Sequence, residues 1–162
     1  DLSTSEELRC RNLMCEHVGE RCACRLAMWF HQHPLPNLRE LSLSGNDLRH
    51  VPLPVFELAS LRVLDLTANK LRGLPEEVDR LEHLEDLRLR GNHLDEGLPS
   101  AVGRLDKLRT VDLRDTDIDA FPEVLLGLPR LDEAWTDVPP PADQGWTASS
   151  DDDTCYYQRR RT

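Results

Sequence analysis

The sequence lacks a hydrophobic run long enough to cross a membrane. No stretch approaches the roughly 20 apolar residues that a membrane-spanning helix needs. The sequence also lacks a surplus of positive charge, because its formal net charge is −10 and its pI is about 5.0. General binding to nucleic acid or to anionic lipid therefore has no electrostatic support. An acidic surface of this kind is typical of a soluble protein.

Common catalytic motifs are missing as well. The sequence contains no Gly-rich phosphate loop, no HExxH motif and no GxSxG motif. We therefore expect no enzymatic activity, no catalytic residue, no bound metal and no cofactor. The chain begins at Asp1 and not at a methionine, which predicts that an upstream segment has been removed.

The sequence does contain an internal repeat with a spacing of 23 residues. Its clearest copies are Leu38–Leu48 (LRELSLSGNDL), Leu61–Leu71 (LRVLDLTANKL) and Leu84–Leu94 (LEDLRLRGNHL). A weaker copy, Leu108–Ile118 (LRTVDLRDTDI), follows after 24 residues, and a partial copy begins at Leu131. Self-similarity at such a period predicts a solenoid of stacked repeats.

The repeated pattern LxxLxLxxNxL resembles the leucine-rich repeat family. The phrase LPEEVDRLEHL resembles the 23-residue units of intracellular members, which include Ras-pathway scaffolds, plant proteins and bacterial proteins. This resemblance implies an α/β fold, namely a right-handed leucine-rich repeat solenoid in the form of a short horseshoe with a parallel concave sheet. A βαβ sheet with full helices is excluded, because 23 residues are too few for it.

Asparagines recur at one position of the repeat. Asn46, Asn69 and Asn92 occupy this position in the first three copies. A buried amide there can bond backbone groups of the turn and of adjacent repeats. Thr116 takes the position in the fourth copy and Pro139 in the fifth, so the repeats are expected to span residues 38–138, the last one in part.

Residues 1–37 are predicted to form a helical N-terminal cap. Ser3 and Glu6 match a capping box, and an apolar stripe at helical spacing follows. The first repeat of a solenoid has an open hydrophobic end that a cap must cover. Trp29 and Phe30 are the expected plugs for that end.

Four of the five cysteines lie in this segment, at Cys10, Cys15, Cys22 and Cys24. We interpret them as reduced, partly buried thiols. A disulfide cap like that of extracellular family members is an alternative, although its close-spaced opening is absent here. A metal site is the other alternative, although zinc-binding pairs usually have two to four intervening residues and Cys22 and Cys24 have one.

Residues 139–162 are predicted to form an irregular C-terminal tail or cap. The segment has no periodicity and joins an acidic run, Asp151–Asp153, to a basic run, Arg159–Arg161. Trp146, Tyr156 and Tyr157 can fix it either across the last repeat or onto a partner.

Outward positions on the predicted strands are the candidate binding surface. Domains of the resembled family usually bind proteins on the concave sheet, and Arg and Trp are enriched among interface hot spots. The candidate partner-binding residues are Arg88, Arg90, Arg114, Trp135, Asp65, Asp86 and Asp112. The competing interpretation is a solvated face whose opposite charges neutralise each other.

We therefore expect a non-catalytic protein-binding module that uses its concave sheet. One alternative is an accessory subunit of a large multiprotein complex, held by the cap and the tail. Another is a metal-linked or redox-linked cysteine cap. The resemblance to intracellular repeats favours the cytosol or an organellar matrix.

Overall fold

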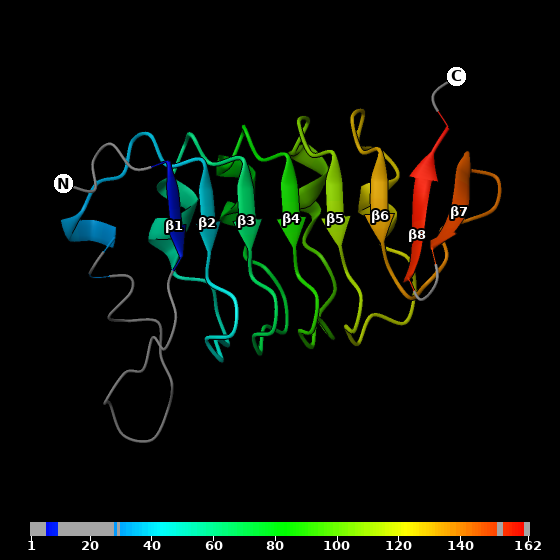
Figure 1. Cartoon of the computed structure of the whole chain (residues 1–162), viewed down its shortest axis with the longest axis horizontal. Helices are drawn as coiled ribbons and strands as arrows, with labels where there is room; N and C mark the ends of the chain where they lie inside the picture. The colour runs from blue at the N-terminus through cyan, green and yellow to red at the C-terminus, as the bar shows by residue number, and fades with distance from the viewer. Residues whose placement is uncertain (1–5, 10–27, 29, 152–153, 161–162) are drawn as a thin grey trace.

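The computed structural model describes residues 6–9, 28, 30–151 and 154–160. In this part of the chain the strands form one open, eight-stranded sheet in the order β1-β2-β3-β4-β5-β6-β8-β7 (Figure 1). Strands β1 to β6 run parallel, whereas β8 is antiparallel to both β6 and β7. The predicted leucine-rich repeat solenoid is confirmed, and an antiparallel hairpin is added to its end.

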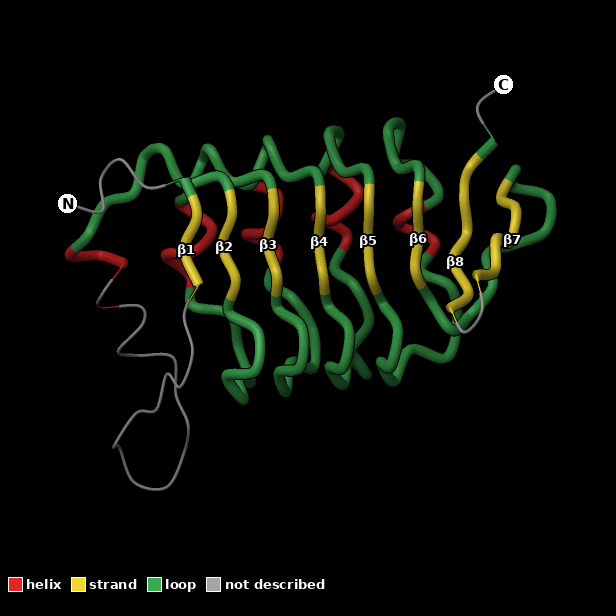
Figure 2. Tube along the Cα trace, in the orientation of Figure 1, coloured by secondary structure: helices red, strands yellow, loops and turns green. Residues whose placement is uncertain are grey.

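The strands are short and are backed by short helices. The strands are β1 (Glu7–Arg9), β2 (Glu40–Ser42), β3 (Val63–Asp65), β4 (Asp86–Arg88), β5 (Thr110–Asp112), β6 (Glu133–Trp135), β7 (Trp146–Asp151) and β8 (Thr154–Arg159). The 3-10 helices are η2 (Leu53–Glu57), η3 (Glu76–Arg80), η4 (Ser100–Arg104) and η5 (Glu123–Leu125). Figure 2 shows these helices behind the repeat strands. A proline precedes each helix, where its fixed φ suits a helix start.

Leucines at alternating positions of each repeat build the core. In the second repeat Leu64 and Leu66 point inward and are fully buried, while Asp65 between them is only half-buried. The parallel register places Leu41, Leu64 and Leu87 next to one another across three strands. Each repeat is too short to bury its own apolar face, so the core becomes continuous only through stacking.

The buried asparagine amides connect successive repeats. The Asn69 amide nitrogen donates to the carbonyls of Leu43 and Leu66, both at 2.9 Å. Its carbonyl oxygen accepts the backbone N–H groups of Asn46 and Leu48, both at 3.0 Å. One side chain thus satisfies four backbone groups that the short strands leave unpaired.

This ladder of amides weakens in the fourth repeat. Asn92 bridges the second and third repeats in the same way. Thr116 donates one hydrogen bond, to the carbonyl of Leu113 at 2.7 Å. A threonine side chain has one donor and lacks the reach of an amide, so it bonds within its own turn.

The residue before each ladder position has a left-handed backbone. Gly45 and Gly91 have φ values of 69°, whereas Ala68 and Asp115 each have a φ of 54°. Residues with a Cβ are disfavoured there by about 1–2 kcal/mol, and glycine is not. Ala68 is therefore a strained position in an otherwise regular turn.

The N-terminal edge of the sheet differs from the prediction. Glu7–Arg9 is a strand that pairs in parallel with β2, so a helix continuing from Ser3 through these residues is wrong. Glu6 also accepts the N–H groups of Arg39 and Glu40, at 2.8 and 2.9 Å. A strand satisfies the exposed backbone edge of β2, which a helix cannot do.

The remainder of the expected N-terminal cap is described only in part. Residues 30–32 are helical, and Phe30 is buried against the core. The expected plug Trp29 and the four N-terminal cysteines lie outside the described residues.

At the other end, the segment expected to be irregular is a β-hairpin. Its strand β8 pairs with β6, so Trp135 lies opposite Tyr156. Trp146 packs against Phe121 with ring centroids 6.0 Å apart. The Arg159 guanidinium donates to the carbonyls of Leu128 and Leu126, which follow η5, at 2.7 and 3.0 Å. The hairpin thereby covers the open end of the fifth repeat.

We predict that Asn69→Leu lowers the free energy of unfolding by about 2–4 kcal/mol, because it removes the acceptor of two buried backbone N–H groups and one of the two amide donors to each of the Leu43 and Leu66 carbonyls. Urea unfolding followed by circular dichroism measures this loss. Lys70→Ala is the matched control, since the exposed Lys70 makes one ion pair with Asp47 at 3.1 Å, worth at most about 1 kcal/mol. Equal losses in the two variants would contradict the role of the amide.

Ala68→Gly is expected to raise the free energy of unfolding by about 0.5–1 kcal/mol. Relief of the left-handed strain exceeds the added entropy of the unfolded chain. Ala120→Gly serves as the control, because Ala120 is exposed and its φ is not positive, and it should be destabilising. A loss of stability in Ala68→Gly as well would show that the turn carries no such strain.

Candidate functional site

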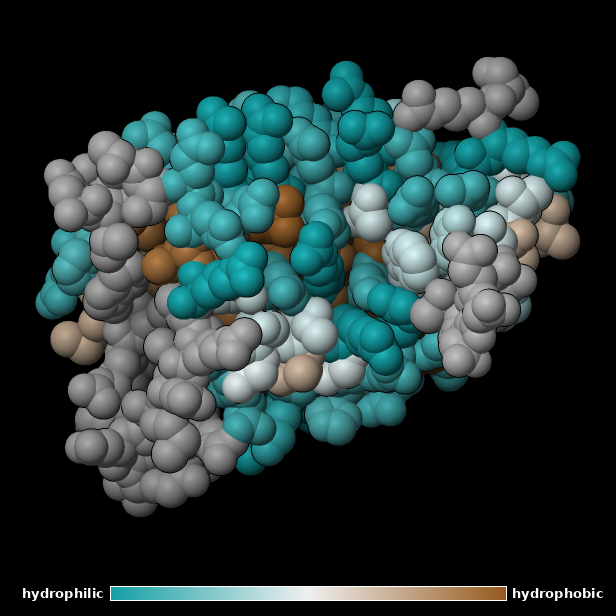
Figure 3. Space-filling model, viewed as in Figure 1, coloured by the Kyte–Doolittle hydropathy of each residue, from teal (hydrophilic) through white to brown (hydrophobic). Residues whose placement is uncertain are grey.

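The outward positions of the strands form regular columns across the sheet. The central column consists of Arg9, Ser42, Asp65, Arg88, Asp112, Trp135 and Tyr156. Strands β1 and β8 thus extend the face beyond the five repeat strands that the sequence predicts. Figure 3, which views this face, shows mostly hydrophilic residues with small apolar areas between them.

Arg88 is paired with a carboxylate on its own strand. Its Nη2 and Nε atoms donate to Oδ2 of Asp86 at 2.6 and 3.0 Å. The hydrogen bond to Asp86 raises the pKa of Arg88 further above its ordinary value, and the charges of Asp65 and Glu40 add to this. The side chain remains half exposed, so its remaining N–H groups face solvent.

Arg114 is held more tightly than Arg88. Its Nε and Nη2 atoms donate to the two carboxylate oxygens of Asp112 at 2.9 and 2.5 Å, which is a bidentate pair. Its guanidinium also lies 4.7 Å from the centroid of the Trp135 ring. The hydrogen bond to Asp112 raises the pKa of Arg114, and only 19% of the side chain is exposed.

Arg90 has a partner that the sequence did not suggest. Its Nε atom donates to Asp115 of the next repeat at 2.7 Å. Asp65 makes no pair with it and accepts instead from the Ser42 hydroxyl at 3.3 Å and the Thr67 N–H at 3.0 Å. The three arginines are therefore separate ion pairs, not one undivided cationic patch.

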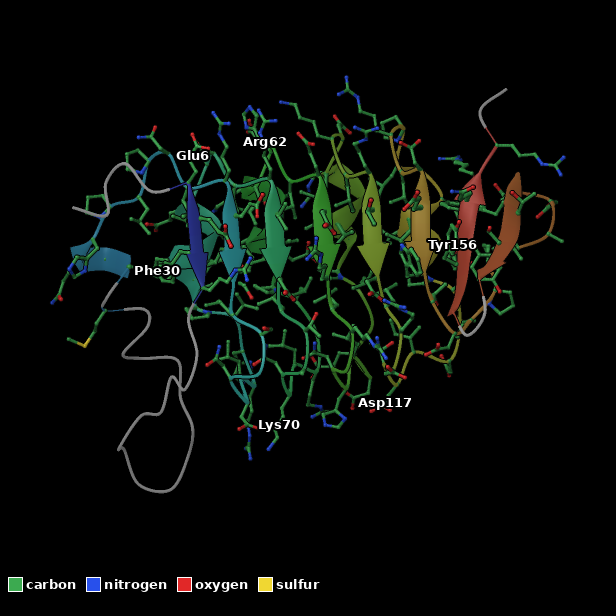
Figure 4. The ribbon with its side chains drawn as sticks, in the orientation of Figure 1. Glu6, Phe30, Arg62, Lys70, Asp117 and Tyr156 are labelled. Carbon is green, nitrogen blue, oxygen red and sulfur yellow. The ribbon has the colours of Figure 1, made fainter. Side chains whose placement is uncertain are left out.

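Trp135 also has an unforeseen neighbour. The Tyr156 ring stacks on it with centroids 4.4 Å apart and an interplanar angle of 21°. Figure 4 labels Tyr156 on β8, beside the last repeat strand. From the sequence, Tyr156 is expected only to fix the tail. Its place beside Trp135 depends on the antiparallel pairing of β8 with β6, which the periodicity of the repeats cannot predict. Arg114, Trp135 and Tyr156 form a continuous stack, which we call the aromatic cluster.

A hollow of about 230 Å³ lies at the other end of the face. Its charged and hydroxyl-bearing residues are Glu7, Arg9, Glu40, Ser42, Ser44, Asp65 and Arg88. The structure therefore brings Asp65 and Arg88 together in this hollow. Asp112 lies opposite Arg88 on the neighbouring strand β5, and Arg114 and Trp135 belong to the aromatic cluster.

Neither a metal centre nor a membrane segment emerges from the described residues. Within them, no group of three or more His, Cys, Asp or Glu side chains is placed to hold a metal ion. No helix among the same residues is both long and apolar enough to span a bilayer. The candidate thiol or metal ligands Cys10, Cys15, Cys22 and Cys24 are outside them.

Comparison with known proteins agrees with this geometry. The leucine rich repeat family profile matches residues 36–94. A leucine-rich repeat protein of Leptospira interrogans is 26% identical with a TM-score of 0.60, over 67% of this chain and 28% of that one. InlP of Listeria monocytogenes is 28% identical with a TM-score of 0.54, over 64% of this chain and 27% of that one.

A plant receptor has a similar structure too. The leucine-rich repeat ectodomain of the receptor kinase SOBIR1 from Arabidopsis thaliana is 26% identical with a TM-score of 0.50, over 76% of this chain and 64% of that one. The chain spans 28% and 27% of the two bacterial proteins. No curated protein sequence gives a significant match.

A double-mutant cycle of Trp135→Leu and Tyr156→Ser should give a coupling energy of about 0.5–1.5 kcal/mol in urea unfolding, because the stacked rings interact directly. Trp135→Leu combined with Thr147→Ala is the control cycle. The Thr147 hydroxyl bonds the carbonyl of Gln158, so a coupling near zero is expected. A coupling near zero in the first cycle would mean that the stack contributes nothing.

Proposed function

Because this chain is built of leucine-rich repeats, we propose that it is a non-catalytic module that binds a protein partner on the face of its sheet. Protein interaction is the general role of such domains, and the similar SOBIR1 ectodomain is likewise a leucine-rich repeat domain. The residues proposed to contact the partner are Arg88, Arg90, Arg114, Trp135, Asp65, Asp86 and Asp112.

The ion pairs on this face support the proposal. A guanidinium has five N–H donors, and Asp86 occupies two of those of Arg88. The others remain able to donate to a carboxylate or carbonyl of the partner. Since Asp86 already restrains the side chain, binding costs less conformational entropy than it would for a free arginine.

The spacing of the features on the face suits a small binding element. Arg88 lies on β4 and Trp135 on β6, two strands apart, which corresponds to about 10 Å. The aromatic cluster offers a rigid apolar surface and the hollow offers polar groups. One helix or loop of a partner can reach both.

The role of accessory subunit in a large complex draws less support. The tail residues Trp146, Tyr156 and Arg159 contact the last repeats of their own chain, which occupies the groups that a docking strap would use. The N-terminal cysteines, on which a redox or metal role depends, lie outside the described residues.

We predict that Arg88→Ala/Arg90→Ala removes partners that the immobilised chain captures from native extract, with at least ~10-fold less recovery, because two hot-spot candidates are lost together. Quantitative mass spectrometry of the captured proteins is the measurement. Both side chains are exposed, so the fold should be retained, as circular dichroism would verify.

Arg49→Ala/Arg80→Ala is the matched control, since both residues are exposed and neither lies on the strands of this face. It removes the same charge and should retain the partners. If the sheet-face variant captures the same proteins in the same amounts as this control, the assignment of Arg88 and Arg90 is wrong.

A further inference from the structure

A groove with a surplus of positive charge lies at one edge of the sheet, where β5 and β6 begin and β8 ends. Its volume is about 730 Å³. Five cations and two carboxylates line it: Lys107, Arg109, Arg130, Arg159, Arg160, Glu85 and Asp132. This edge is the upper one in Figure 1, and Arg62 marks it in Figure 4. The whole chain, in contrast, has a net charge of −10.

The fold assembles this groove from distant parts of the sequence. Lys107 and Arg130 occupy the same position in consecutive repeats, between the 3-10 helix and the next strand. Strand β8 runs antiparallel to β6, so its end meets the beginning of β6. The Arg159 N–H donates to the Asp132 carbonyl at 2.9 Å, which brings the basic end of the tail beside the repeat cations.

Both carboxylates of the groove already have cationic partners. Glu85 pairs with Arg62 at 3.3 Å, and Asp132 pairs with Arg109 at 3.5 Å. They are therefore not free to neutralise the other four cations.

Those four cations form no ion pair with a carboxylate of the described residues. The Arg159 guanidinium bonds the neutral carbonyls of Leu126 and Leu128, which fixes its position and leaves its charge intact. Within the described part of the chain, no carboxylate forms an ion pair with Lys107, Arg130 or Arg160. Arg130 and Arg160 are exposed as well.

We propose that this groove binds an acidic peptide segment of a protein partner, whose carboxylates contact Lys107, Arg130 and Arg160. The groove extends over three neighbouring strands, β5, β6 and β8, or about 10 Å. Three or four residues of extended chain cover that distance at about 3.3 Å per residue. The strongest argument is charge complementarity in a site where Lys107, Arg130 and Arg160 form no ion pair with a described carboxylate.

A nucleic acid fits the groove less well than a peptide. No aromatic side chain is among the residues that line it, so bases have nothing to stack on. A polyanion that extended beyond the groove would also meet the acidic remainder of the chain. A short acidic segment avoids both problems.

This groove is distinct from the sheet face. Its lining includes neither Arg88 nor Arg90, and it lies at the edge where the strands begin. A partner that occupied both surfaces would bind the module at two separate points. The groove can therefore be tested independently of the sheet face.

The test is fluorescence anisotropy at low ionic strength with a fluorescein-labelled hexaglutamate peptide and the full chain. Lys107→Glu/Arg130→Glu should weaken binding at least ~10-fold, because two attractive charges become repulsive. Arg160→Gln should weaken it about 3-fold through loss of one charge. Added salt should weaken binding to the unmodified chain through screening.

Arg49→Glu/Arg80→Glu is the matched control, because it changes the net charge equally and neither residue lines the groove. It should bind the peptide within ~2-fold of the unmodified chain. Circular dichroism establishes that each variant is folded, and the Arg160→Gln result stands if the double reversal is not.

Three results would overturn the proposal. One is the absence of peptide binding to the unmodified chain at millimolar concentration. Another is equal weakening by the groove and control reversals, which would mean that overall charge alone attracts the peptide. The third is tighter binding of oligothymidylate or complete displacement by equimolar inorganic phosphate, which would assign the groove to nucleic acid or to a small anion.

Discussion

The buried amide of Asn69 is the interaction on which the rest of this structure depends. Strands of three residues form only a short ladder between neighbouring repeats, and the turns that follow them leave further polar groups inside the protein. The amide satisfies these groups in two repeats at once, at distances of 2.9–3.0 Å. Unpaired, they would each destabilise the fold by about 1–3 kcal/mol. The leucine core provides the driving force, and the amide sets how one repeat stacks on the next.

That stacking also orders the charges on the surface. Residues one repeat apart in sequence become neighbours, so Arg72 lies beside Asp95 and Arg62 beside Glu85. The hydrogen bond from Arg72 lowers the pKa of Asp95. Such exposed pairs add little to stability. Their larger effect is to neutralise many of the described cations locally, so that those without an ion pair among the described residues stand out.

The sequence predicts the repeats well and the ends poorly. The leucines and Asn46, Asn69 and Asn92 recur at fixed spacing, so the solenoid and the outward columns follow from periodicity. Strand β1 and the hairpin each occur once, and they form because they pair with the exposed backbone edges of the repeat sheet. No local sequence pattern encodes such pairing. Spacing placed Arg88 and Arg90 on one face. It did not supply the partner of Arg90, because Asp115 lies in a turn whose direction depends on its left-handed backbone.

The reversal of strand direction at β8 determines how this architecture can change in length. A further parallel repeat cannot be appended after β6, because an antiparallel strand already occupies that edge, and β1 occupies the opposite edge. Growth or shortening must therefore occur by inserting or deleting whole units between them. A unit inserted between β4 and β5 would increase the separation of the hollow and the aromatic cluster by about 4.8 Å, leaving the residues of both unaltered. Because both edges of the repeat sheet are occupied, the distance between the hollow and the aromatic cluster can change only in steps of one repeat.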